Sequence, residues 1–281
     1  MRRCGVLLLA AAAVCGAGQE APKRAPIVLG YYPSWVAHPN AKEIRYDRFT
    51  HLAHAFLRSD GEGRLKEDRA IPNRELTQRA HDQGVKVLLS LGGAHSAKAF
   101  REIVRSAEAR DRYAAAVAKT AAESGYDGVD LDWEPTEGDE DRKGVVVLVR
   151  ALRAALPAAI VSMAAPASDW YGKAWDVDEL QKHVDFLNVM TYDFHGPWSG
   201  HAGHNAPLRA AAGDEDGAVA SVESGMAYWT AKRRWPAGRL NVGIPCYGRG
   251  FAVKEWHRKP AGKARHETID HHDVPAFLEN S

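Results

Sequence analysis

Residues 127–134 read DGVDLDWE, an alternation of acidic and bulky apolar side chains from which the rest of the chain can be interpreted. Alternate side chains of a strand share a face, so Asp130, Asp132 and Glu134 point one way and the apolar residues between them point the other. The acids then follow one another at about 6.6 Å, measured between Cα atoms. The apolar residues indicate a strand buried on both faces; a solvated acidic edge and an acidic metal site are the alternatives.

Carboxyl groups at this spacing cannot all be ionised in a low-dielectric interior, so at least one is expected to hold a proton near neutral pH. A carboxylic acid kept protonated can donate to the leaving oxygen of a glycosidic bond. Glu134 is the last and longest of the three and is best placed to reach a substrate. The sequence therefore favours acid-catalysed cleavage with Glu134 as the proton donor.

The rest of the chain alternates short apolar runs with longer helical stretches, the pattern of β/α units around a parallel sheet. We expect helices over 96–124 and 145–156, and another that carries apolar residues at helical spacing from Val219 to Trp229. The expected strands are 27–32, 51–57, 85–91, 128–134, 160–165, 186–192 and 240–247. This pattern predicts an α/β fold, a TIM (β/α)8-type barrel with its active site at the carboxyl ends of the strands. Residues 254–281 offer no convincing eighth strand, so we expect an incomplete, C-terminally truncated barrel with strand 8 missing and unpaired edges on strands 1 and 7.

Four motifs resemble the signatures of family 18 glycoside hydrolases, the chitinase family. They are SLGG at 90–93, DGVDLDWE at 127–134, MTYDFHG at 190–196 and YGRGF at 247–251. They resemble, in that order, the family's SxGG, DGxDxDWE, MTYDFHG and YGRGF. The openings of the first two strands, at 30–32 and 55–56, are similar as well. Because the motifs occur in the family's order from about residue 27 to 253, chance similarity is excluded as an explanation.

The resemblance implies hydrolysis with retention of configuration, in which the sugar supplies its own nucleophile. Glu134 would protonate the glycosidic oxygen while the carbonyl of the substrate's 2-acetamido group attacks the anomeric carbon, giving a cyclic oxazolinium intermediate. Asp132 would orient the acetamido group and stabilise its charge, and Asp130 would share a proton with Asp132. Tyr192 would donate its hydroxyl to the acetamido oxygen. The implied substrate is chitin or another polymer of β-1,4-linked N-acetylglucosamine, including peptidoglycan-derived glycans and the N-glycan core.

Seven further residues are expected to bind the sugar by the same resemblance. They are Tyr31, Phe56, Gly93, Met190, Asp193, Tyr247 and Arg249. The aromatic residues and the methionine would form the walls of the pocket, although plain core packing is the alternative for each of them. Gly93, with Gly92, would allow close packing or an unusual backbone turn at the barrel mouth. Asp193 would bond the sugar, and Arg249 would bond the substrate or a neighbouring carboxylate.

Two departures from the family pattern bear on activity. Many chitin-cutting members have a tryptophan after the SxGG motif that stacks on the sugar beyond the cleaved bond, and here that position is Ala94. The family's strand 8 normally ends in a tryptophan beneath the reacting sugar, and we expect no such strand. Two alternatives to an enzyme therefore remain: a carbohydrate-binding protein of the same fold and an inactive truncated barrel. The presence of Glu134 favours catalysis, because the chitinase-like lectins have usually lost that acid.

The start of the chain resembles an export signal. Residues 1–18 combine two arginines, an apolar run and small residues, which predicts a cleaved signal peptide, a linker over 19–26 and a catalytic barrel over 27–281. We therefore expect a secreted or periplasmic protein. Cys15 as a lipid-attachment site is the alternative. After cleavage Cys246 is the remaining cysteine, so no internal disulfide is expected.

Composition and histidine spacing exclude several partners. The formal charge of +1 comes from 37 basic and 36 acidic residues, so no basic field indicates nucleic acid. His195, His201 and His204 suggest zinc, yet their spacing matches no firm metal motif. We expect no metal, no cofactor, no nucleic acid, no membrane contact beyond a possible lipid anchor, and a monomer that binds chitin or an N-acetylglucosamine-containing oligosaccharide.

Overall fold

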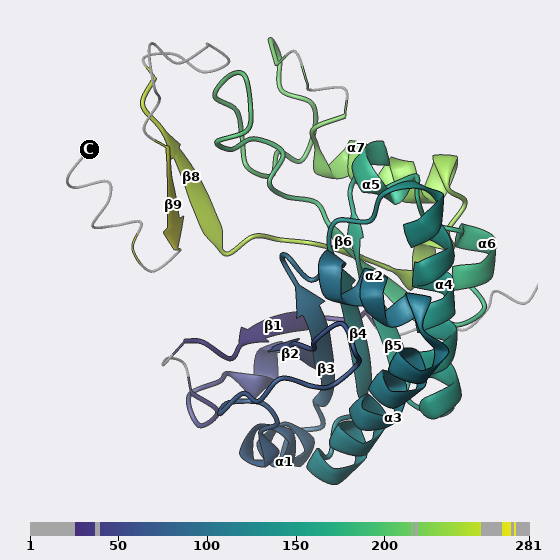
Figure 1. The fold of residues 1–281 in the computed structure, drawn as a ribbon. Helices are drawn as coiled ribbons and strands as arrows, with labels where there is room; N and C mark the ends of the chain where they lie inside the picture. Colours follow the sequence, from purple (N-terminus) through teal and green to yellow (C-terminus); the bar gives the residue numbers. More distant parts are fainter. Residues whose placement is uncertain are drawn as a thin grey trace, which may run out of the picture.

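The centre of the fold is a curled parallel sheet in which each strand pairs with the next one along the chain (Figure 1). The computed structural model describes residues 26–36, 40–214, 216, 219–253, 266–270 and 273. The strands of this sheet are β1 (Leu29–Pro33), β2 (His51–Leu57), β3 (Lys86–Gly93), β4 (Gly128–Trp133), β5 (Ile160–Pro166), β6 (Phe186–Met190) and β7 (Leu240–Val242). Every pairing between them is parallel. This order is that of a β/α barrel, and the predicted fold class is confirmed.

Helices cover the outer face of the sheet, where α2, α3 and α4 pack beside one another (Figure 1). The α-helices are α1 (Arg74–Asp82), α2 (Ala97–Arg105), α3 (Ala107–Ser124), α4 (Gly138–Ala155), α5 (Asp169–Gly172), α6 (Val177–Leu180) and α7 (Val222–Ala227). Shorter helical turns are η1 (Tyr46–Arg48), the π-turn η2 (Tyr228–Lys232) and η3 (Ala237–Arg239).

The single helix expected over 96–124 is in fact two helices. Ser106 has an extended backbone between α2 and α3, and its side-chain oxygen accepts a hydrogen bond from the Ala109 amide. A serine in this position satisfies an amide of the first turn, so it begins a new helix rather than continuing the old one. At the far end, Gly125 takes the left-handed conformation with φ 76°, which ends α3 as expected.

Strand β4 is buried on both of its faces, as the alternation predicted. Val129, Leu131 and Trp133 belong to the apolar core under the helices, where the Trp133 ring lies 5.2 Å from that of Phe100. Asp130 and Asp132 are also buried. The apolar layer fixes the strand against the helices and thereby fixes the acids on the inner side of the curled sheet.

The last described strands form a separate hairpin. The strand expected over 240–247 ends at Val242, and β8 (Tyr247–Phe251) pairs antiparallel with β9 (His266–Asp270). Figure 1 shows this hairpin standing away from the parallel sheet. Among the described residues no eighth strand joins the barrel, so β1 and β7 are its edges, and Ile244 beyond β7 is 80% exposed. The expectation of an incomplete barrel is confirmed in this respect.

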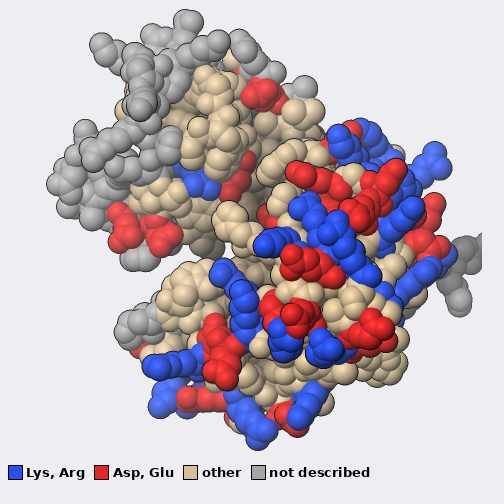
Figure 2. Space-filling view, in the orientation of Figure 1, with Lys and Arg blue, Asp and Glu red and all other residues tan. Residues whose placement is uncertain are grey.

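The predicted signal peptide and linker, with Cys4 and Cys15, lie outside the described residues, apart from Pro26. Cys246 is exposed and has a free thiol. Within the part of the chain that the structure describes, no helix is long and apolar enough to cross a bilayer. In space-filling form, the molecule is hollowed between the part that carries β1 and β2 and the part that carries β8 (Figure 2).

Candidate active site

Asp130 is held at the centre of the curled sheet by donors from four other strands. Its Oδ2 accepts hydrogen bonds from the Tyr31 hydroxyl and the Ser90 hydroxyl, both at 2.9 Å. Its Oδ1 accepts from the Ser162 hydroxyl at 2.7 Å and from the Asn188 amide at 3.0 Å. Burial raises the pKa of Asp130, and these hydrogen bonds act in the opposite direction because they favour the ionised form. Asp130 is therefore fixed in place and cannot rotate toward a substrate.

Asp132 lies one step closer to the open end of the strand and is much less well satisfied. It is 4% exposed, and its Oδ1 has no hydrogen-bond partner. Burial, and after it the neighbouring Glu134 carboxyl, raise the pKa of Asp132 well above its usual range. The raised pKa favours the protonated form of Asp132, and the proton can be shared with the neighbouring Glu134 carboxyl. Of the three stacked acids, Asp132 is thus the one whose burial and neighbouring Glu134 carboxyl favour retention of the predicted proton.

Glu134 follows directly after the last residue of β4 and is half-buried. Its Oε2 accepts a hydrogen bond of 3.4 Å from the Tyr171 hydroxyl. Its amide donates to the Ser96 hydroxyl at 3.4 Å, and that hydroxyl donates to the Asp132 carbonyl at 3.0 Å. Ser96 thus braces the backbone on both sides of the turn that presents Glu134. The carboxyl can therefore meet a ligand while its backbone stays fixed to β3 and β4.

Tyr192 follows β6 and faces the same group of acids. Burial, and then the Asp132 carboxyl, raise the pKa of its phenol, so the hydroxyl remains protonated and available as a donor. Its ring meets that of Tyr247 edge to face, with the ring centroids 6.2 Å apart. The structure thus brings the phenol predicted from the MTYDFHG motif next to the carboxyls predicted from DGVDLDWE.

Asp193 and Arg249 form an ion pair beside this group. Nη2 and Nε of Arg249 donate to Oδ1 of Asp193 at 2.6 and 3.1 Å. The guanidinium carbon of Arg249 lies 5.1 Å from the ring centroid of Trp198 and the same distance from that of Tyr247. Asp193 has φ 58°, a left-handed conformation, and its amide donates to the side chain of Asn205. The pair joins the turn after β6 to the β8 hairpin.

The remaining predicted sugar-binding residues belong to four strands of the sheet: Tyr31 to β1, Phe56 to β2, Gly93 to β3 and Met190 to β6. The Phe56 ring stacks on Trp35, with centroids 5.8 Å apart. Gly93 has φ 83°, and a Cβ atom there would approach the Phe56 ring to 2.6 Å, so only glycine fits against that ring. Tyr31 is 40% exposed beside Asp130, and Met190 is half-buried at the end of β6. A common sugar pocket formed by all seven residues stays a prediction.

Several residues of the site were missed by sequence reasoning. They are Trp35, Ser96, Ser162, Tyr171, Asn188 and Trp198. Ser162 and Asn188 each interrupt an otherwise apolar buried strand, and that interruption was an available signal. Trp35 is 67% exposed and Trp198 60% exposed, which is unusual for so large an apolar ring and marks both as candidate platforms for a sugar.

The histidines considered as metal ligands form a cluster with acids of a later loop. Ligand atoms of His195, His201, Asp214 and Asp216 all lie within 4.8 Å of one another. His201 Nε2 lies 2.9 Å from Asp214 Oδ1, and His195 Nε2 lies 3.3 Å from Asp214 Oδ2. Burial opposes ionisation of Asp214, but the hydrogen bonds with His201 and the Asp216 amide, together with the two nearby imidazoles, outweigh it and lower the pKa of that carboxyl. The buried Asp214 carboxylate contacts both imidazoles, so the cluster can be explained as a set of contacts that stabilise this loop. The His204 carbonyl oxygen lies 3.0 Å from His195 Nδ1.

A parallel β/α barrel with stacked acids at the end of β4 defines a class of glycoside hydrolase-like proteins. The chain matches the model of glycosyl hydrolases family 18 over residues 27–280, and it belongs to that family. It is 30% identical over 251 residues to a chitinase-like effector of Moniliophthora roreri, a match that covers 82% of this chain and 60% of the effector. The chain spans between 8% and 60% of the length of the curated relatives it matches.

Two solved structures show the same fold at comparable similarity. The second catalytic domain of the Group II chitinase of Ostrinia furnacalis, a mutant in complex with (NAG)5, has a TM-score of 0.80 and 26% identity over 90% of this chain and 76% of that chain. A chitinase-like agglutinin of Robinia pseudoacacia has a TM-score of 0.78 and 26% identity over 90% of this chain and 80% of that one. The fold is thus similar both to chitinases and to a chitinase-like agglutinin.

Proposed function

We propose that this chain is a retaining glycoside hydrolase that cleaves β-1,4-linked N-acetylglucosamine polymers by substrate-assisted catalysis. The observation that carries the proposal is the graded set of acids on β4. Asp130 is fully hydrogen-bonded, Asp132 is buried with an oxygen that lacks a partner, and Glu134 is half-buried at the open end. Such a gradient gives a fixed acceptor, a proton reservoir and a group that can reach substrate.

In the first step Glu134 donates its proton to the glycosidic oxygen as the bond between that oxygen and the anomeric carbon breaks. The carbonyl oxygen of the 2-acetamido group attacks the anomeric carbon, which forms the oxazolinium ring. Asp132 accepts a hydrogen bond from the acetamido N–H, and Tyr192 donates its hydroxyl to the acetamido oxygen. Both contacts hold the nucleophile in line with the breaking bond.

In the second step the Glu134 carboxylate takes a proton from water as the water oxygen bonds to the anomeric carbon. The ring opens, and the sugar is released with its original configuration and with Glu134 protonated again. The unpaired Oδ1 of Asp132 supports this scheme, since a buried carboxylate oxygen without a donor is available to a ligand N–H. The (NAG)5 complex of the Ostrinia furnacalis relative supports an N-acetylglucosamine oligomer as ligand.

A comparison of the purified chain with its Glu134→Gln variant tests the proposal. Hydrolysis of N-acetylglucosamine oligomers is expected to fall at least ~100-fold in kcat, because glutamine cannot donate the proton. Glu137→Gln is the matched control, since the Glu137 side chain is 72% exposed and contacts Arg101 at 3.8 Å. Equal activity of the wild type and Glu134→Gln would refute the assignment of the acid.

A non-catalytic carbohydrate-binding protein is the second candidate, and the similarity to the agglutinin and to the chitinase-like effector favours it. An inactive truncated barrel is the third, which rests on the seven-stranded sheet of the described residues. The same assay separates them when binding of the oligomers is measured beside hydrolysis. Binding without hydrolysis in both the wild type and Glu134→Gln supports the lectin, and absence of both supports the inactive barrel.

We further propose that the protein is exported after cleavage near residue 18 and that it acts as a monomer with residues 27–281 as its catalytic unit. The arginine-flanked apolar run over 1–18 supports export. The intact mass of the protein recovered outside the cytoplasm tests this, because a lipid on Cys15 would add the mass of its acyl chains. Its elution volume in gel filtration tests the monomer.

A further inference from the structure

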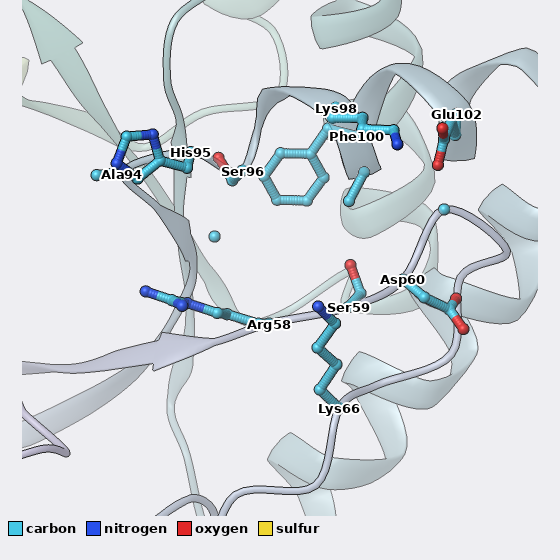
Figure 3. Close-up of a pocket in the computed structure, with 13 residues that line it drawn as sticks. Arg58, Ser59, Asp60, Lys66, Ala94, His95, Ser96, Lys98, Phe100 and Glu102 are labelled. Carbon is cyan, nitrogen blue, oxygen red and sulfur yellow. The ribbon is translucent and has the colours of Figure 1, made fainter.

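A cavity of about 350 Å³ lies beside the Glu134 turn, between the loop after β2 and the start of α2 (Figure 3). Figure 3 shows Arg58 and Lys66 on one wall and His95 and Ser96 on the opposite wall. Ser96 is also the residue whose hydroxyl accepts from the Glu134 amide and donates to the Asp132 carbonyl. The cavity is thus continuous with the structure that presents the catalytic acid.

The basic side chains of this cavity lack ionic partners among the described residues. The side chains of Arg58, Lys66 and Lys98 line it, and none of them forms an ion pair with any residue that the structure describes. Elsewhere on the same surface basic side chains are paired, as Arg101 is with Asp141 and Arg105 with Glu140. Unpaired cations that line a cavity favour an anionic ligand.

The backbone places Arg58 and Lys66 on the same wall of the cavity, although their charged ends point apart in Figure 3. Lys66 donates its amide to the Arg58 carbonyl at 2.8 Å, next to the antiparallel bridge between Ser59 and Leu65. Two cationic side chains thus stand on one wall of the cavity, and an anion bound there would give relief from the excess positive charge of that wall. Asp60 does not provide the relief, because its carboxylate accepts from the amides of Glu62 and Arg64 and pairs with the Arg64 side chain at 3.0 Å.

The start of α2 adds donors to the same cavity. Its first turn holds no acidic residue, and the side chain of its N-cap residue, Ser96, makes no capping hydrogen bond to its first amides. These amides and the positive end of the helix dipole face a negative charge favourably. Glu102 also lines the cavity, and in Figure 3 it lies on the side of Phe100 away from His95. The part of the cavity near His95 is therefore the part that suits an anion.

Ala94 leaves this cavity without a large side chain at its edge. It lines the cavity and is exposed, at the position where the related chitin-cutting enzymes carry an aromatic platform for the leaving-side sugar. We infer that the cavity binds an acidic substituent, a carboxylate or a sulfate, on the sugar at the leaving side of the cleaved bond. This rests on the proposed function, and it makes the substrate an acidic N-acetylglucosamine copolymer rather than neutral chitin.

Two kinds of oligomer test the inference and separate the sources of the anion. One alternates N-acetylglucosamine with a sugar that bears a lactyl carboxylate, the other bears a 6-sulfate, and neutral N-acetylglucosamine oligomers of equal length serve as reference. Binding to Glu134→Gln is measured by titration calorimetry, so the result does not depend on turnover. We expect at least one acidic oligomer to bind ten-fold or more tightly than the neutral one at low salt, with the difference shrinking as salt is raised.

The double variant Arg58→Gln/Lys66→Gln, made in the same background, should bring the ratio of acidic to neutral affinity down to about one. Lys119→Gln/Arg105→Gln is the matched control, because it removes two basic side chains from surface ion pairs elsewhere and should retain the preference. Equal affinities in the parent chain, or a preference that survives the double variant, overturn the inference. Tight binding of acidic oligomers together with no turnover by the wild type would refute the proposed hydrolase while leaving the anion site standing.

Discussion

Replacement of Asp132 by asparagine is expected to make the folded protein more stable while it abolishes hydrolysis. The Asp132 carboxyl is buried, its Oδ1 has no partner, and its ionised form lies against the Glu134 carboxyl. An asparagine amide at this position would instead donate a hydrogen bond to Glu134. A hydrogen bond to a charged group contributes about 1.5–3 kcal/mol. We therefore expect a gain of about 2 kcal/mol at pH 8, or about 4–8 °C in Tm for a domain of this size.

The pH dependence of stability provides the sharper measurement. Because the pKa of Asp132 is raised in the folded state, the folded protein holds a proton that the unfolded chain has released. The stability contributed by this carboxyl is therefore present below its ordinary pKa of 3.8 and is lost as pH rises through the raised folded value. Urea unfolding across pH 4 to 9 should show this loss in the wild type and a flatter profile in Asp132→Asn.

Asp141→Asn is the matched control, since it makes the same chemical change at a carboxyl that has its partners. Asp141 is 2% exposed, and it accepts from Arg101 Nη2 and the Glu137 amide, each at 2.7 Å. Because Arg101 is partly exposed, we expect a loss of about 1–3 kcal/mol there. The expected gain in Asp132→Asn means that the wild-type carboxyl lowers the stability of the folded protein while it serves the reaction. If both variants lose stability alike, this interpretation is refuted.

Three further outcomes are expected. His54 is fully buried, and burial lowers its pKa to about 4. The free energy of unfolding should therefore fall by about 3 kcal/mol as pH falls from 6.5 to 4, because the unfolded chain takes up a proton that the folded protein does not. His54→Gln should remove this part of the pH dependence in urea titrations, and a profile identical to that of the wild type would contradict it. Tyr192→Phe should lower kcat by about 100-fold while KM and Tm stay nearly constant, because it removes the hydroxyl that donates to the acetamido oxygen. A change confined to KM would show that the phenol contributes to substrate binding alone. Arg249→Lys should raise KM several-fold, because a lysine ammonium cannot replace the planar guanidinium that bonds Asp193 and Thr268 together. Equal KM values in the variant and the wild type would exclude a role for the Asp193–Arg249 ion pair in substrate binding.

The order of the strands and the arrangement of the acids could be predicted because they follow from local patterns. Strand β4 alternates acidic and apolar residues, and only one register of that alternation buries the apolar side chains against helices. Gly125 ended its helix as expected for the same reason, since the left-handed conformation is a local property of glycine. A local sequence pattern is therefore sufficient to predict an element when only one conformation satisfies it.

Contacts between distant segments could not be predicted in this way. The sequences of residues 160–166 and 186–190 do not predict that Ser162 and Asn188 will both donate to the Asp130 carboxylate. This contact depends on how β4, β5 and β6 are aligned. The break at Ser106 was missed because the segments on both sides, the second of them rich in alanine, favour helix more strongly than one serine opposes it. The stacking of Trp35 on Phe56 likewise depends on the close approach that Gly93 permits.

The same hydrogen bonds explain why a costly polar layer persists in the interior of this sheet. Ser90, Asp130 and Ser162 are direct neighbours in the register of β3, β4 and β5. Asn188 on β6 completes the layer, and its side-chain Oδ1 accepts a hydrogen bond from the side-chain amide of Asn241 on β7. A slip of one residue in any of these strands would place a leucine, valine or methionine against the Asp130 carboxylate and leave its oxygens unsatisfied. The layer therefore specifies the alignment of the strands around Asp130, and that alignment sets Asp132 and Glu134 at the height where a substrate can reach them.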